Sequence, residues 1–181
     1  MHIVPGRPAD CAGRLDKEIR TYDFLDRVGI PYHTCDHPAA YTMEDCLAVD
    51  SALGTRMCKN LFLCNRQETD FYLLLMPDDK PFRTKQLSQQ LGCSRLSFAD
   101  GKYMEMLLDI TPGALSLMGL INDQEHRVHL LVDEDLLTDE YIGCHPCVNT
   151  ASVKLTTKDA FGAFLTATGH ELTPVHLTAE N

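Results

Sequence analysis

Apolar residues recur at spacings of three and four between residues 14 and 28, a pattern typical of a helix with one buried face. Gly29 is placed to end this helix, because glycine readily adopts the left-handed conformation of a C-cap. Thr42 begins a Thr-x-x-Asp capping box, which predicts a second helix that ends at Gly54.

Two runs rich in apolar and aromatic residues, at 59–64 and 70–77, are separated by the polar sequence NRQET. This arrangement predicts an antiparallel hairpin of buried strands. The other predicted elements are two strands, three helices and a loop punctuated by glycine and proline. They are the strands at 31–37 and 126–133, the helices at 84–91, from about 99 and from 157 to 169, the last capped by Thr157, and the loop at 110–123.

Helices and strands are mixed along the chain, and two neighbouring strands are joined by a hairpin rather than by a helix. This order favours an α+β or mixed-sheet α/β fold, with a mostly antiparallel sheet, over a doubly wound parallel sheet. With 181 residues, 44% of them hydrophobic and 23% charged, the chain fits a single domain. We expect this domain to span residues 14–181, after an N-terminal extension at 1–13.

No apolar run approaches the roughly 20 residues of a membrane span, and the first residues lack the basic and apolar regions of a signal peptide. The sequence therefore predicts a soluble cytoplasmic protein with no membrane partner. Its eight cysteines are accordingly expected to be reduced thiols. Because no glycine-rich nucleotide motif is present, we expect no cofactor.

The formal net charge is −10, which argues against a protein that wraps DNA or a long stretch of RNA. It is compatible with a protein that holds only one end of an RNA. Positive charge gathers between residues 80 and 102, where Asp100 is the one acidic residue. This stretch is either a solvated surface or an RNA-facing one.

The sequence Cys144-His145-Pro146-Cys147 has the spacing of a redox dithiol or of half a zinc site. A redox dithiol needs a helix that begins at its first cysteine, but the residues after Cys147 are typical of a turn and a strand. A zinc site needs a second ligand pair, and the sequence has no other Cys-x-x-Cys. We therefore expect no metal site and interpret the two cysteines as buried filler.

Lys59 stands at the start of a strand that otherwise has the pattern of a buried one. Its stem can cover apolar surface while its ammonium reaches water, or the ammonium can be fixed at a pocket rim to meet a phosphate or an oxyanion. The loop from Thr111 to Gly119 also has two interpretations. It is an ordinary turn, or its glycines let backbone N–H groups point at a ligand.

Six segments resemble, in their order along the chain, one known family: HPAAYTMEDC, KNLFL, LGCSRLSFAD, TPGALSLMGLIND, GCHPCVNTAS and FLTATGHE. The combination is similar to the YbaK/prolyl-tRNA synthetase-associated editing domains, and within them to the free-standing branch known as PrdX or ProXp-ala proteins. The resemblance spans roughly residues 20–175. It implies a mixed-sheet α/β domain around one pocket, which hydrolyses the ester of a wrong amino acid, typically alanine, on tRNA(Pro).

The resemblance also implies catalytic roles for four residues. Lys59 is expected to bind the terminal adenosine or its phosphate and to orient the ester. Backbone N–H groups near Gly113 would stabilise the oxyanion formed when water attacks, so that no protein nucleophile is needed. His145 and Asn149 would line the aminoacyl pocket and help to exclude the prolyl group.

Further residues are expected to bind the substrate: Thr42, Ser116, Leu117, Gly143 and Pro146 in the pocket, with Lys85 and Arg95 on the surface that faces the CCA end and acceptor stem of a mischarged tRNA. Leu117 departs from the family, which usually has proline there, and this departure puts the rigidity of the loop in question. It keeps open a non-catalytic module of the same fold that binds tRNA or an aminoacyl group. A Cys-x-x-Cys oxidoreductase is the third reading, and a role for prolyl-tRNA synthetase as partner is also left open.

Overall fold

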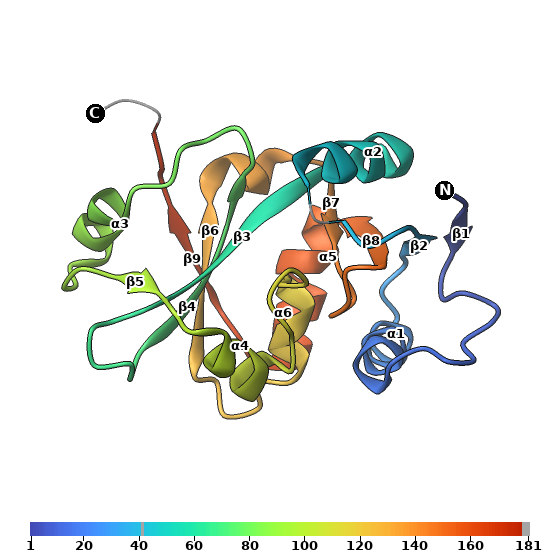
Figure 1. Cartoon of the computed structure of the whole chain (residues 1–181), viewed down its shortest axis with the longest axis horizontal. Helices are drawn as coiled ribbons and strands as arrows, with labels where there is room; N and C mark the ends of the chain where they lie inside the picture. Colours follow the sequence, from blue (N-terminus) through green and yellow to red (C-terminus); the bar gives the residue numbers. More distant parts are fainter. Residues whose placement is uncertain (41, 179–181) are drawn as a thin grey trace.

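One mixed sheet runs through the chain, with β3 near its centre (Figure 1). The computed structural model describes residues 1–40 and 42–178, and within these ranges the sheet has nine strands in the order β1-β2-β8-β7-β3-β4-β6-β9, with β5 paired to β3. The strands are β1 (Ile3–Pro5), β2 (His33–Asp36), β3 (Arg56–Cys64), β4 (Phe71–Pro77), β5 (Ser97–Phe98), β6 (Val128–Asp133), β7 (Tyr141–Cys144), β8 (Ala151–Thr156) and β9 (Leu172–Val175). The helices are α1 (Asp16–Val28), α2 (Met43–Leu53), α3 (Thr84–Leu91), α4 (Gly101–Leu108), α5 (Thr157–Phe161) and α6 (Ala163–Thr168), together with the 3-10 helices η1 (Leu117–Ile121) and η2 (Glu134–Thr138).

Most neighbouring strands of this sheet are antiparallel, which confirms the predicted α+β fold with a mixed sheet. The predicted hairpin is present as β3 and β4, with Lys59 opposite Met76. Parallel pairs join β3 to β7, β4 to β6 and β6 to β9. Within the predicted N-terminal extension, β1 pairs with β2 and so joins the sheet.

Local capping signals explain where the helices begin and end. Gly29 adopts the left-handed conformation, with φ of 78°, at the end of α1. The capping box at Thr42 begins α2, and Gly54 ends it, as predicted. The helix predicted at 84–91 is α3, with the predicted bounds. No helix in the described part of the chain is long and apolar enough to cross a membrane.

The last helix differs from the prediction in its cap and in its continuity. Thr156, not Thr157, is the N-cap, because its hydroxyl accepts a hydrogen bond from the backbone N–H of Asp159 at 3.0 Å. The backbone at Gly162 then leaves the helical region, so that α5 and α6 replace one continuous helix. The strands β1, β5, β7 and β9 are not evident from the sequence, because two to four residues are too few to show alternation.

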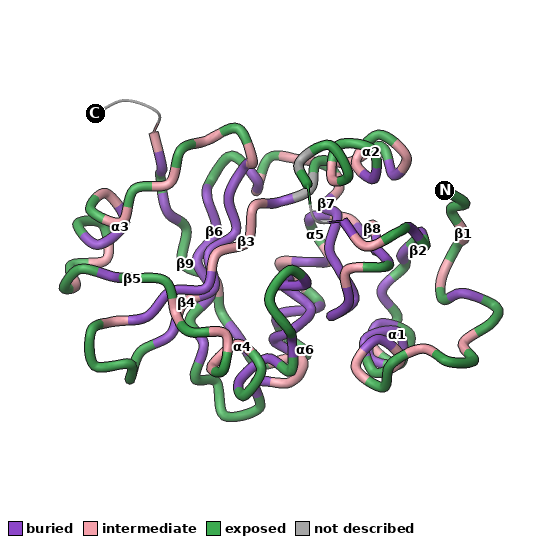
Figure 2. Tube along the Cα trace, viewed as in Figure 1, coloured by how far each residue is buried: buried purple, intermediate pink, exposed green. Residues whose placement is uncertain are grey.

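Strand β4 is buried along nearly its whole length and separates two apolar cores (Figure 2). Because successive side chains of a strand point to opposite faces, Leu73 enters the larger core and Leu74 the smaller one. In the larger core, Phe24 of α1 meets Phe164 of α6 edge to face, with ring centroids 5.5 Å apart. Leu87 of α3 closes the smaller core.

Candidate active site

A cavity of about 400 Å³ lies beside β3 and brings three of the predicted catalytic residues together. Lys59 comes from β3, Gly113 from the loop between α4 and η1, and His145 from the residue directly after β7. Most of the remaining lining is apolar, with Asp50 and Asp78 as its acidic members. A largely apolar pocket with a few convergent polar groups is the usual form of a ligand site.

The Lys59 ammonium is partly buried and already has one fixed partner. Its Nζ donates a hydrogen bond to the backbone carbonyl oxygen of Lys80 at 2.8 Å. An ammonium has three donors, so Lys59 can keep this bond and still donate to a ligand in the cavity.

The carbonyl that holds Lys59 belongs to a residue that is itself clamped. The Lys80 ammonium forms ion pairs with Asp133 at 2.8 Å and with Asp135 at 2.7 Å. Asp133 is completely buried at the end of β6. The loop between β4 and α3 is therefore tied to β6 and η2, and this tie fixes the carbonyl oxygen that orients Lys59.

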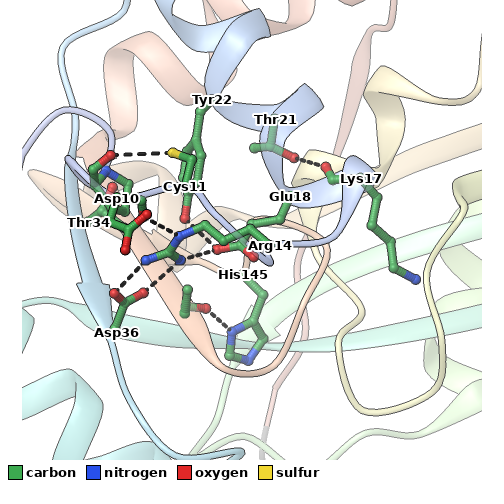
Figure 3. Close-up of polar contacts among 12 residues, drawn as sticks. Asp10, Cys11, Arg14, Lys17, Glu18, Thr21, Tyr22, Thr34, Asp36 and His145 are labelled. Atoms are coloured by element: carbon green, nitrogen blue, oxygen red, sulfur yellow. Dashed lines mark hydrogen bonds and ion pairs between the residues drawn. The ribbon is translucent and has the colours of Figure 1, made fainter.

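His145 is buried, and its hydrogen bonds define which ring nitrogen carries the proton. Nδ1 lies 2.9 Å from the carbonyl oxygen of Ala151, which can only accept, so Nδ1 donates (Figure 3). Burial, together with the nearby His37, lowers the pKa of His145, so the ring is neutral near pH 7. In this tautomer Nε2 carries a lone pair and can accept a hydrogen bond in the cavity.

A second histidine supports His145 through a serine. The hydroxyl of Ser152 lies 3.3 Å from Nδ1 of His145 and 2.9 Å from Nε2 of His37. The two rings are 5.9 Å apart. His37 and Ser152 have no distinctive sequence signal of their own, although both stand inside the segments that carry the family resemblance, HPAAYTMEDC and GCHPCVNTAS.

Charged side chains tie the start of α1 to the end of β2 (Figure 3). The Arg14 guanidinium donates to both carboxylate oxygens of Asp36, at 2.9 and 2.6 Å, and to the buried carboxylate of Glu18. Tyr22 donates to the same Glu18 at 2.9 Å. Two parallel bonds from a guanidinium fix geometry well, so this network holds the end of β2, where His37 follows Asp36.

Gly113, which lines the cavity, lies close to Asn149. Gly113 has φ of 96°, a conformation that favours glycine, and a Cβ atom there would lie 3.9 Å from Nδ2 of Asn149. Asn149 lines a neighbouring cavity of about 480 Å³, and its carbonyl oxygen accepts a hydrogen bond from the N–H of Ala40 at 3.2 Å. Asn149 is therefore close to Gly113, but among the described residues it lines the neighbouring cavity instead of the first one.

Ser116 and Leu117 are buried behind the loop, outside the described lining of the cavity. The Ser116 hydroxyl caps η1 by accepting from the N–H of Met118 at 3.1 Å. Leu117 is fully buried in the larger core. Both residues hold the loop in place from behind.

The other predicted substrate-binding residues differ in burial. None of them is among the described residues that line the cavity. Thr42 is exposed and caps α2, which itself supplies Cys46 and Asp50 to the cavity. Gly143 is paired with Lys154 inside the sheet, and Pro146 is buried after β7. Lys85 on α3 and Arg95 before β5 are both exposed.

The two cysteines of the Cys-x-x-Cys are buried thiols. Burial raises the pKa of Cys144 to about 12 and that of Cys147 to about 11, so neither is a thiolate near neutral pH. The chain continues from Cys147 into a turn and then β8, as predicted, rather than into a helix that would lower a thiol pKa. This environment is unsuited to redox catalysis.

The profile of the aminoacyl-tRNA editing domain matches residues 37–161, a range that contains Lys59, Gly113 and His145. The chain belongs to this family. The match confirms the family inferred from the six sequence segments.

Known proteins similar to this editing domain carry related names. The prolyl-tRNA editing protein ProX of Acetoanaerobium sticklandii is 31% identical over 135 residues, which cover 75% of this chain and 82% of that protein. Prolyl-tRNA synthetase associated domain-containing protein 1 of Danio rerio is 31% identical over 166 residues, which cover 91% and 87%. A crystal structure described as a candidate trans-editing enzyme for prolyl-tRNA synthetase shares the fold, with a TM-score of 0.67 at 17% identity over 91% of this chain and 99% of that one.

Proposed function

We propose that this editing domain is a free-standing deacylase that removes alanine from mischarged tRNA(Pro) in the cytoplasm. The names of its relatives support tRNA(Pro) as the substrate class. The observation that carries the proposal is the grouping of Lys59, Gly113 and His145 on one mostly apolar cavity of about 400 Å³. This volume lies at the small end of ligand pockets, which suits the aminoacyl end of a tRNA.

Water is the nucleophile in this mechanism. The neutral His145 ring accepts a hydrogen bond from the water through Nε2 and so orients its oxygen toward the ester carbon. As the water oxygen bonds to that carbon, negative charge develops on the carbonyl oxygen. The Lys59 ammonium and the backbone N–H groups near Gly113 stabilise this charge.

The intermediate then collapses in the direction of hydrolysis. The bond between the carbon and the ribose oxygen breaks, and the proton of the attacking water passes to that oxygen. The products are free alanine and uncharged tRNA. An aminoacyl ester is already activated, so orientation and a few donors suffice for this reaction.

Two contacts order the loop at Leu117, where a proline would otherwise restrict the backbone. The Leu117 side chain is anchored in the core, and the Ser116 hydroxyl caps the helix that follows. Both contacts support an ordered, active loop. They weigh against the alternative function, a non-catalytic module of the same fold that binds tRNA or an aminoacyl group.

A panel of charged tRNAs tests the proposal. We expect hydrolysis of Ala-tRNA(Pro) and no hydrolysis of Pro-tRNA(Pro), with Ser-tRNA(Pro) as an intermediate case. Selection by a small hydrolytic site is the physical remedy for the weak discrimination of small apolar side chains by binding alone. If no member of the panel were deacylated, either alone or with prolyl-tRNA synthetase added, the non-catalytic alternative would be favoured.

A further inference from the structure

Phe98 is an aromatic side chain that the fold holds in place but leaves open to water. The residue is 63% exposed. Its backbone is nevertheless fixed. Phe98 pairs with Leu63 of β3, and the backbone N–H of Ala99 donates to the carbonyl oxygen of Phe62 at 2.9 Å. The Phe82 ring meets it edge to face, with centroids 5.9 Å apart. The ring is therefore supported by one neighbouring ring and still accessible.

Phe98 also lines the same cavity as Lys59. Lys59 lies four positions before Leu63, the partner of Phe98, on β3, which corresponds to about 13 Å along the strand. The backbone of Phe98 therefore lies toward the other end of the cavity from that of Lys59.

The distribution of charge favours this end of the cavity as the one from which the RNA part of the substrate extends. Asp50 of α2 lies toward the opposite end of β3, and α2 and β5 stand at the two ends of that strand (Figure 1). Around Phe98 basic residues outnumber acidic ones instead, with Arg95 before it and Lys102 after it against Asp100. Alternating aromatic and basic residues are typical of surfaces that bind single-stranded nucleic acid, since any base can stack on a ring while cations attract the phosphates.

We propose that Phe98 is a stacking platform for an unpaired base of the CCA end of the substrate tRNA. This inference rests on the proposed function and adds a binding residue to it. The base contacts the open face of the ring, and the basic residues on either side of it in the sequence attract the backbone. Stacking at this point holds the acceptor end while the ester reaches Lys59.

Substitutions of Phe98 test the platform through two measurements, KM for Ala-tRNA(Pro) and Kd for a short single-stranded RNA that ends in CCA. Stacking of one base on an aromatic residue corresponds to a loss of roughly 5-fold to 150-fold on truncation to alanine. We expect Phe98→Ala to raise both KM and Kd by about tenfold and to change kcat by less than about twofold. Phe98→Trp should bind as tightly as the wild type or more tightly, and Phe98→Leu as weakly as alanine.

Met106→Ala is the matched control, because Met106 on α4 is similarly exposed, at 61%, and is not part of the described lining of the cavity. We expect it to change neither constant. Unchanged KM and Kd in Phe98→Ala would overturn the platform. So would full binding of the RNA by Phe98→Leu, which would indicate an apolar contact that needs no aromatic stacking. If the wild type hydrolysed no mischarged tRNA, the proposed function would fail, while the RNA affinities would still decide whether Phe98 stacks a base.

Discussion

At the residue scale, the protonation state of His145 controls the proposed orientation of water. Burial lowers its pKa below the usual value, so the neutral ring persists to lower pH than in a free histidine. We expect kcat for Ala-tRNA(Pro) to stay level from about pH 8 down to about 6.5 and to fall only below that, when Nε2 gains a proton. A pH–rate profile measures this, and a decline that began above about pH 7 would contradict the assignment.

Substitutions of His145 and of the two cysteines beside it should differ in their effect on deacylation. Because Cys144 and Cys147 are protonated and buried, we expect the double substitution Cys144→Ala/Cys147→Ala to keep kcat within about threefold of the wild type, although lost packing lowers the melting temperature. His145→Ala and Asn149→Ala should each reduce kcat/KM far more. The reverse ranking of deacylation rates would reopen a role for sulfur.

At the scale of elements, the loop between β4 and α3 positions Lys59 through the clamp on Lys80. We expect Lys80→Met to lower the free energy of unfolding by about 3 kcal/mol, because it leaves the buried Asp133 unpaired, and to lower kcat/KM by about tenfold. Denaturant unfolding and deacylation kinetics measure the two effects. Arg20→Met, which removes an exposed ion pair with Asp109, is the control and should change neither. Wild-type kinetics in Lys80→Met would show that the clamp does not act on Lys59.

Elements with strong local signals could be predicted, and contacts between distant segments could not. The bounds of α2 and α3 follow from caps within a few residues of each end, such as Thr42 and Gly92. The clamp joins Lys80 to a residue on β6, and the support of His145 comes partly from His37, before α2. The periodicity of apolar residues along the chain does not predict such pairs, because they depend on which strands become neighbours.

Some residues of the candidate site could likewise be predicted from the sequence, and others could not. The family resemblance pointed to Lys59, Gly113 and His145, and these three line one cavity although they come from separate parts of the chain. Phe98 belongs to the resembling segment LGCSRLSFAD, but its place on the surface depends on the pairing of β5 with β3, and a strand of two residues is too short to be predicted.

At the scale of the whole molecule, a net charge of −10 contrasts with the basic stretch between residues 80 and 102. We expect Lys85→Glu/Arg95→Glu to weaken binding of tRNA(Pro) and to reduce the slope of log Kd against log salt by roughly 1.5. The matched control reverses two exposed charges elsewhere, Arg127→Glu/Lys158→Glu, and should leave the slope nearly unchanged. Equal slopes for the two double variants would place the RNA on another face.

The most direct test of the central claim is single-turnover deacylation of Ala-tRNA(Pro) by the wild type and by Lys59→Met, which keeps most of the buried stem and removes the ammonium. Loss of one donor to a developing oxyanion typically costs 10²-fold to 10³-fold in rate. We predict a loss of at least about 100-fold, with a melting temperature close to that of the wild type. A folded Lys59→Met protein that hydrolysed Ala-tRNA(Pro) at the wild-type rate would contradict the account.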